Sequence, residues 1–324
     1  MKLTPLLLTA IVFFNGNIRA GVAARHLAIL KTIPYDSFKL AGGSEPAADG
    51  LIGHNRGGYR SPAFQRDAAR LLISGAAYGD KKSIDDAFRG IDVVFSHQDA
   101  SGHFGGDKTP SGVAFWLCEL NQALLVLEES EAGAAYHAHV LELIPKIHRA
   151  AIWLALPKNQ ERLKTGDART PNRLFFDALA YGTSGLLCKD ESLTRLGRSF
   201  VESAQRLYRA EDGVFLEKGG HDSSYQAVSG WLLQVWVLFF PDPTLETVAD
   251  KAALWVVDRI RSDGSVDASG NTRSGLGKEI WQGKAKEVNY REVLRCIFYY
   301  AARKGDLHAM AAAGRLEVWL RQKT

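Results

Sequence analysis

The sequence predicts an all-α fold, an α/α toroid made as an incomplete barrel of about five to six helical hairpins. Apolar residues recur with the period of a helix along most of the chain, whereas the alternation of a β-strand is nearly absent. Two kinds of helix alternate: amphipathic helices with one hydrophilic face, and helices that are apolar on nearly every side. Because a helix that is apolar all round must be surrounded by other helices, we expect an inner ring enclosed by an outer one.

The first 23 residues have the pattern of a secretory signal peptide. Lys2 precedes an apolar run from Leu3 to Phe14 that is too short to span a bilayer, and Ala20 and Ala23 are small residues that suit a signal peptidase. We therefore expect a signal peptide over residues 1–23 and one domain over residues 24–324, located in the periplasm or outside the cell. No later stretch is expected to cross a membrane.

The helices of the first half follow from these patterns in chain order. Expected helices cover residues 24–33 (outer), 62–78 (inner), 83–97 (outer), 112–128 (inner) and 137–155 (outer). Pro62 stands in the first turn of the first inner helix, where its missing N–H is not needed. The outer helix that follows has amphipathic spacing in Ile84, Phe88 and Ile91, whereas the next inner helix contains the apolar run VAFWLCELNQALLVL.

The second half repeats the alternation. Expected helices cover residues 174–188 (inner), 191–209 (outer), 224–240 (inner), 244–261 (outer), 289–303 (inner) and 306–321 (outer). The inner helices read LFFDALAYGTSGLLC, SYQAVSGWLLQVWVLFF and NYREVLRCIFYYAAR, while the outer helix after residue 190 has its apolar residues at Leu193, Leu196 and Phe200.

Loop lengths place the functional face. Connections from an inner helix to the next outer helix are short, whereas those from an outer to an inner helix are long, at residues 98–110, 157–172, 210–222 and 262–288. Because successive helices alternate in direction, the long loops should gather at one end, above the amino termini of the inner helices. Large loops on one end of a rigid scaffold are where binding and catalysis usually occur.

Composition excludes several classes of protein. With 46% hydrophobic residues in 324, the chain can bury a large core. Its formal charge of +4 falls to +2 once the segment with Lys2 and Arg19 is removed, which is too weak to indicate nucleic acid binding. Cys118, Cys188 and Cys296 lack the spacing of a zinc site and are expected as buried thiols. We expect no cofactor and no metal, and a monomer.

The polar and aromatic residues of the loop-bearing face are the candidates for a site. They include His54, Asn55, Arg56, Tyr59, His103, Asn172, Arg173, Glu217, His221, Asp222, Tyr225, Arg273, Lys278, Trp281, Lys286 and Tyr290. The amino termini of the inner helices also point to this face, and their partial positive charge favours anions. A substrate that carries carboxylates would suit such a face.

One stretch resembles a known group of enzymes. The run DGVFLEKGGHDSSYQ, residues 212–226, is similar to the Asp-Gly-Ser-Phe…His…Tyr segment of toroid polysaccharide lyases, among them the chondroitin, hyaluronan, alginate and glucuronan lyases. In those enzymes an Asn at an earlier inner-helix start partners the His and Tyr, and TPNRLFF offers Asn172. The spacing from His221 to Tyr225 is shorter than in the chondroitin lyases, and no β-sandwich domains follow.

The resemblance implies cleavage of a uronate-containing, anionic polysaccharide by β-elimination. Asn172 and Arg173 would neutralise the substrate carboxylate, and His221 or Tyr225 would act as base and acid. Further sugars would be bound by His54, Asn55, Arg56, Tyr59, His103, Glu217, Arg273, Lys278, Trp281 and Tyr290. Which of His221 and Tyr225 is the base, which polyuronate is cleaved, and whether the cut is internal or terminal stay open.

Simpler explanations exist for the same residues. Asp222 and His221 could cap the following helix, Asn172 could cap its own, and Tyr225 could be an ordinary core aromatic. A glycoside hydrolase on the same toroid is the main alternative, with a carboxylate pair drawn from Glu217, Asp222, Asp263, Asp267 and Glu279. A non-catalytic carbohydrate-binding protein of the cell envelope is a third possibility.

Overall fold

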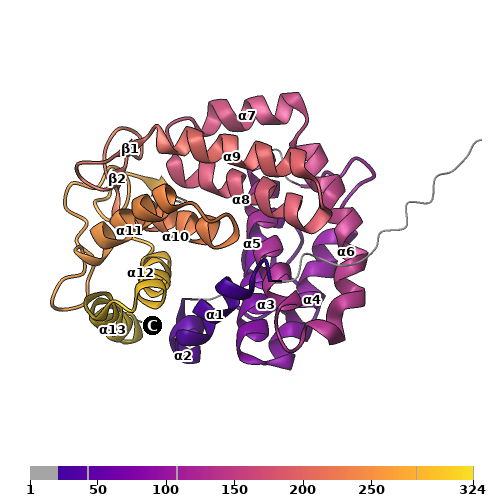
Figure 1. Ribbon diagram of the computed structural model, residues 1–324, viewed down its shortest axis with the longest axis horizontal. Coiled ribbons are helices and arrows are strands. Elements are labelled where there is room, and N and C mark those ends of the chain that lie inside the picture. The colour runs from indigo at the N-terminus through magenta and orange to yellow at the C-terminus, as the bar shows by residue number, and fades with distance from the viewer. Residues whose placement is uncertain (1–20, 42–43, 107–108, 282, 324) are drawn as a thin grey trace, which may run out of the picture.

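Inner and outer helices alternate along the chain in the computed structural model (Figure 1), which describes residues 21–41, 44–106, 109–281 and 283–323. The inner helices are α3 (Arg66–Tyr78), α5 (Pro110–Glu128), α8 (Pro171–Cys188), α10 (Ser223–Phe239) and α12 (Tyr290–Lys304). The outer helices are α4 (Lys81–Ser96), α6 (Gly133–Leu154), α9 (Glu191–Gln205), α11 (Pro243–Val257) and α13 (Leu307–Lys323). The fold is the α/α toroid that the hydrophobic pattern predicts.

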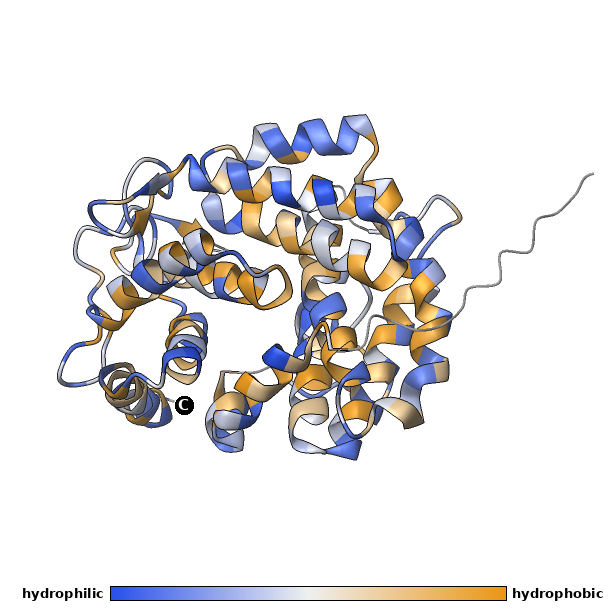
Figure 2. Cartoon of the chain, in the orientation of Figure 1, coloured by the Kyte–Doolittle hydropathy of each residue, from blue (hydrophilic) through white to orange (hydrophobic). Residues whose placement is uncertain are grey.

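Packing around the ring follows chain order. Helix α3 packs on α5, α5 on α8, α8 on α10 and α10 on α12, and each inner helix packs against the outer helix that follows it. In Figure 2, α10 is mostly hydrophobic, whereas α7 at the rim of the molecule is mostly hydrophilic. A single core cluster runs through the inner helices and the inward faces of the outer ones.

Local sequence explains where the helices begin. Helices α5, α8 and α11 start at a proline, whose missing N–H is not needed in the first turn. Aspartates cap four helices by accepting hydrogen bonds from free backbone amides: Asp80 for α4, Asp190 for α9, Asp222 for α10 and Asp242 for α11.

Helix α1 (Ala24–Thr32) does not belong to the outer ring, although its position in the sequence suggested that it would. It contacts α3, α5, α10 and α12. The ring of His26 is fully buried and bonds the hydroxyl of Tyr299, late in α12, at 2.8 Å, while Tyr78 at the end of α3 donates to the carbonyl of Leu30 at 2.9 Å. The helix therefore packs across the end of the toroid opposite the long loops, against the carboxyl ends of α3 and α12.

Three segments that we expected to be loops carry additional structure. Helix α7 (Pro157–Asp167) fills most of the connection before α8. Its mostly polar sequence lacks the apolar periodicity that predicts the other helices. Two short hairpins, β1 (Tyr208–Arg209) with β2 (Val214–Phe215) and β3 (Ile280–Trp281) with β4 (Lys284–Ala285), lie inside later loops. A small helix α2 (Tyr35–Leu40) follows α1, and two 3₁₀ turns, η1 (Gly53–Asn55) and η2 (Pro62–Gln65), precede α3.

Three sequence-based expectations concern apolar segments. The expectation that no later stretch could cross a membrane is wrong by length and composition, because α5 is long and apolar enough; most of α5 is buried among the other inner helices. Cys118, Cys188 and Cys296 are buried and unpaired, as expected. The expected signal peptide lies outside the described residues except for residues 21–23, of which Ala23 is fully buried beside α1.

Candidate active site

At the mouth of the toroid, the otherwise buried inner helices carry side chains that are partly exposed. Tyr225 is the one residue of α10 that is not buried, and it lies in the first turn. Near the start of α5, Ser111 and Phe115 are partly exposed, whereas every residue from Trp116 to Leu127 is buried. In α8, Arg173 is likewise partly exposed near the start of the helix. The inner helices are therefore accessible mainly near their amino ends, where the long loops gather.

A buried layer of ion pairs lies one to two turns below this mouth. Arg70 of α3 donates to Glu119 of α5 at 2.8 Å and to Glu292 of α12 at 3.0 Å, and Arg295 approaches Glu119 at 3.7 Å. These side chains are 6 to 14% exposed. Each charge has a partner, as buried charges require, so the layer ties three inner helices together beneath the site.

Tyr225 meets two cations at the mouth. The Lys286 Nζ makes a short hydrogen bond with the Tyr225 hydroxyl, and the Arg273 guanidinium carbon lies 4.0 Å from the centre of the Tyr225 ring. Burial raises the pKa of Tyr225, although Arg273 opposes this, so the phenol is protonated at neutral pH. Burial also lowers the pKa of Lys286. The pair can therefore hold and pass a proton.

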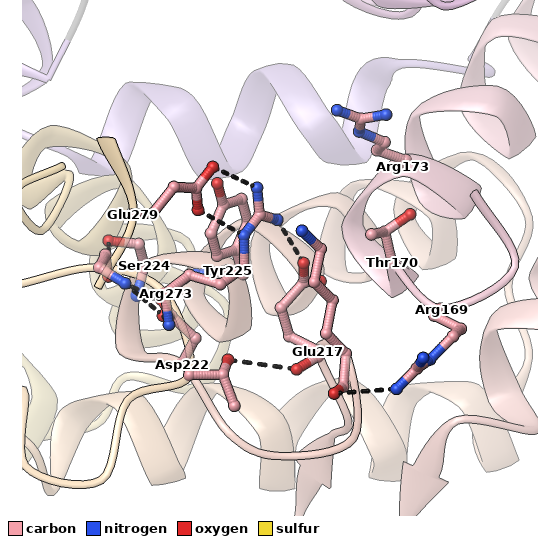
Figure 3. A network of polar contacts seen from close by, with 12 residues as sticks. Arg169, Thr170, Arg173, Glu217, Asp222, Ser224, Tyr225, Arg273 and Glu279 are labelled. Atoms are coloured by element: carbon pink, nitrogen blue, oxygen red, sulfur yellow. Dashed lines mark hydrogen bonds and ion pairs between the residues drawn. The ribbon is translucent and has the colours of Figure 1, made fainter. Parts of the chain in front are cut away.

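Arg273 is held between two carboxylates (Figure 3). Its Nη1 donates to Glu217, and its Nε and Nη2 donate to Glu279 at 2.6 and 2.8 Å. Glu217 is fully buried, and burial raises its pKa although Arg273 lowers it; the Arg273 hydrogen bonds lower the pKa of Glu279. The clamp fixes the guanidinium against Tyr225.

Asp222 organises the loop beneath Arg273. One of its oxygens caps α10 by accepting from the amides of Ser224 and Tyr225, at 3.1 and 3.4 Å. The other accepts from the amides of Arg273 and Ser274, at 2.8 and 2.7 Å. Because the side chain is fully buried and its oxygens are occupied, Asp222 positions Tyr225 and Arg273 and is closed to a substrate.

Asn172 and Arg173 begin α8 on the neighbouring part of the mouth. Arg173 is 41% exposed and bonds Asp167 at 3.0 Å. Asn172 is buried, and its Oδ1 has no hydrogen-bond partner among the described residues. The backbone of Arg169 is bonded to the backbone of Lys218, which joins this loop to the one that carries Glu217.

His221 makes its contacts on another side of the loop. Its Nε2 lies 3.1 Å from the Ser269 carbonyl and 3.3 Å from Arg259, and its ring packs on Trp255 of α11. None of these groups contacts Tyr225 in the described structure. The arrangement brings Tyr225, Arg273 and Lys286 together, whereas His221 faces the outer helix.

The HNRGGYR segment forms a turn before α3. Asn55 is buried and holds the turn, because its Oδ1 accepts from the amides of Arg60 and Ser61 at 2.9 and 3.2 Å. Arg56 donates to the Glu45 carbonyl at 2.6 Å, Tyr59 stacks on His97 at 3.9 Å, and His54 packs beside Phe64.

The other predicted binding residues are spread over the loops. His103 packs against Trp153 of α6, and Lys278 donates to the Asn271 carbonyl at 2.8 Å. Tyr290 packs on Trp319 of α13. Trp281 lies in β3, and its side chain is outside the described part of the structure.

Two residues of the mouth have roles that the sequence did not predict. Lys286 was among the candidates of the loop-bearing face as a cation for further sugars, and Arg66 was not singled out at all. The sequence does contain a signal for Arg66, because Arg66 and Arg70 are four residues apart and therefore lie on the same face of one helix. Within the described ranges, no three His, Cys, Asp or Glu side chains gather in a way that could hold a metal ion.

Comparison with known proteins finds likeness in fold only. No family model and no curated protein matches the chain. An unsaturated glucuronyl hydrolase from Bacillus sp. GL1 aligns at 13% identity and a TM-score of 0.54, over 93% of this chain and 84% of that one. A variant of an unsaturated glucuronyl hydrolase from Streptococcus agalactiae, complexed with dGlcA-GalNAc6S, aligns at 13% identity and a TM-score of 0.51, over 99% and 85%. At this identity the likeness shows the shared toroid.

Proposed function

We propose that this protein is a carbohydrate-active enzyme that binds a uronate-containing, anionic polysaccharide at the mouth of the toroid and cleaves it by β-elimination. One observation carries the proposal: the Tyr225 hydroxyl, on the one unburied residue of α10, is hydrogen-bonded to a lysine whose pKa is lowered by burial. A phenol with such a partner can serve as base and as acid within one reaction.

The proton follows a short path in this reaction. The substrate carbon next to the carboxylate gives its proton to the Tyr225 oxygen, while the Tyr225 hydroxyl proton passes to Lys286 in those molecules in which this amine is deprotonated. The glycosidic bond then breaks. Tyr225 gives its hydroxyl proton to the departing oxygen, and Lys286 returns a proton to Tyr225. No water is consumed, and the new double bond stays in the uronate ring. Both residues end in the state in which they began.

Arg173 stabilises the charge that develops on the substrate. Its guanidinium is more exposed than that of Arg273 at the same mouth, and a charge-assisted hydrogen bond to the carboxylate strengthens as the adjacent carbon loses its proton. Asn172 is buried beside it, and its Oδ1 has no hydrogen-bond partner among the described residues, so its amide is free to bond the substrate carboxylate or a sugar hydroxyl. Export to the periplasm or the medium belongs to the same proposal, since polysaccharide substrates lie outside the cell.

A hydrolase is the second candidate, because the two solved structures compared above are described as unsaturated glucuronyl hydrolases. Its carboxylate pair would have to face the substrate. Glu217 and Asp222 are fully buried, and Glu279 is engaged by Arg273 through two hydrogen bonds. Asp263 and Asp267 accept hydrogen bonds from the hydroxyls of Ser265 and Ser269 in exposed turns. These positions favour elimination over hydrolysis.

The test is incubation of the mature protein with alginate, glucuronan, hyaluronan and pectate. Ultraviolet absorbance of an unsaturated product and the number of new reducing ends are followed together. Elimination raises both in step. Reducing ends without the absorbance would establish the hydrolase, and binding without either product would leave a non-catalytic carbohydrate-binding protein.

A further inference from the structure

Arg66 presents a guanidinium at the mouth that forms no ion pair with a described carboxylate. It is the first residue of α3, and it is half-buried. Its Nε donates to the Ala63 carbonyl at 2.9 Å, which fixes the side chain. Throughout the part of the chain that the structure describes, no carboxylate lies within 4.0 Å of Arg66, whereas Arg70, one turn below, has two carboxylate partners.

Two aromatic rings hold this guanidinium in place. Its central carbon lies 5.3 Å from the centre of the Phe115 ring and 5.6 Å from that of Phe176. The two rings pack together, with their centres 4.7 Å apart. Such cation–π contacts orient a cation but do not neutralise it. Burial and the nearby charge of Arg70 lower the pKa of Arg66, and the carboxylates of Glu119, Glu292 and Asp67 offset this only in part, so a bound anion would favour the charged guanidinium.

We propose that Arg66, on the platform formed by Phe115 and Phe176, binds the carboxylate of a uronate residue other than the one that reacts. The inference rests on the proposed function, because it assigns a subsite within the same mouth. A carboxylate matches the planar fork of a guanidinium through two parallel hydrogen bonds. Arg70 cannot take this role because its donors already face Glu119 and Glu292.

The subsite is separate from the proton-transfer pair. Arg66 contacts α5 and α8 through the two rings, and it has no described contact with Tyr225, Arg273 or Lys286. A sugar held at Arg66 is therefore recognised for its charge without taking part in the reaction. The consequence is selectivity for chains that carry more than one uronate.

The experiment measures equilibrium binding of D-glucuronate and of D-glucose to the full mature protein. A monosaccharide has no glycosidic bond to cleave, so the measurement is independent of turnover. Arg66→Gln should weaken binding of glucuronate by about ten- to a hundred-fold, the loss expected for hydrogen bonds to a charged group, and leave glucose binding unchanged. Arg66→Lys should retain part of the preference, because it keeps the charge but loses the fork.

A matched control and a second variant keep the result interpretable. Arg198→Gln removes an exposed arginine from the outer helix α9 and should bind glucuronate as the wild type does. Phe115→Leu keeps the Arg66 charge and removes one ring, so it should weaken glucuronate binding less than Arg66→Gln. It tests the subsite independently if Arg66→Gln does not fold. Equal binding of glucuronate by wild type and Arg66→Gln, or no preference of the wild type for glucuronate over glucose, would overturn the subsite.

The outcome is distinguishable from failure of the proposed reaction. Arg66-dependent binding of glucuronate together with no unsaturated product from any polymer would support the subsite and reject the lyase. Formation of unsaturated product with unchanged glucuronate binding in Arg66→Gln would support the lyase and reject the subsite.

Discussion

At the scale of single residues, the Tyr225 hydroxyl is the group on which turnover should depend. Tyr225→Phe removes one oxygen and little packing volume, so the fold should persist. Since a general acid or base typically contributes about a hundred- to ten-thousand-fold, kcat should fall by that range while polysaccharide binding stays nearly unchanged. Tyr136→Phe is the control, because Tyr136 lies in the outer helix α6 and its hydroxyl donates to Asp85, away from the pair. Full turnover by Tyr225→Phe would remove Tyr225 from the mechanism.

Lys286 gives the reaction a pH dependence with a defined sign. Burial lowers the pKa of its ammonium, so the neutral amine that accepts the Tyr225 proton forms at lower pH than in an ordinary lysine. Turnover should rise with pH through this pKa, below the usual value of about 10.4. Lys286→Arg keeps a cation that cannot deprotonate and should abolish the rising limb along with most activity. A pH profile in this variant that matches the wild type would exclude the relay.

The sequence predicted part of this site at residue level. Tyr225, Arg173 and Arg273 were identified because polar residues at the starts of apolar helices and in the long loops stand out. The direction in which His221 points could not be read from the sequence, because it depends on Trp255 and Ser269, which come later in the chain. That Arg66 forms no ion pair among the described residues could not be read from the sequence either, because Glu119 and Glu292 pair with Arg70 across the ring.

At the scale of helices, the ion-pair layer should contribute strongly to stability. Arg70→Leu leaves the buried carboxylates of Glu119 and Glu292 without their shared partner, a change that typically costs about 3–5 kcal/mol in the free energy of unfolding. Lys81→Leu breaks the exposed pair with Asp85 and should leave stability nearly unchanged. Chemical denaturation measures both. Equal, small effects would mean that the layer is solvated.

Helix α1 makes stability depend on pH through His26. Burial lowers the pKa of His26 from 6.5 to about 3. Below pH 6.5 the unfolded chain binds a proton that the folded protein does not bind until about pH 3, so stability falls as the pH falls through this window. The slope contributed is about 1.4 kcal/mol per pH unit.

The variant His26→Gln isolates this contribution. Urea unfolding in steps below pH 6.5 should give a shallower pH dependence in the variant, whatever its absolute stability. An unchanged slope would show that the imidazole of the wild type already binds its proton in the folded state, and that burial of His26 does not lower its pKa as described.

At the scale of the whole molecule, alternation of amphipathic and fully apolar helices was sufficient to predict the toroid. It could not predict the role of α1, because a buried helix at the end of a ring and a helix in the outer layer present the same amphipathic pattern. It also missed α7, whose helix has few apolar residues to reveal a period. Long-range contacts decide the position of α1, whereas α7 rests on a proline at its start and on polar residues that favour a helix.

The central claim is that the mouth of this toroid cleaves a uronate polymer without using water. Mass spectrometry of the fragments from a defined uronate oligosaccharide tests it most directly. Elimination predicts that the masses of the two fragments add up to the mass of the substrate, with one fragment lacking the elements of water relative to an ordinary sugar. Fragments whose summed mass exceeds the substrate by one water would contradict the account and establish hydrolysis.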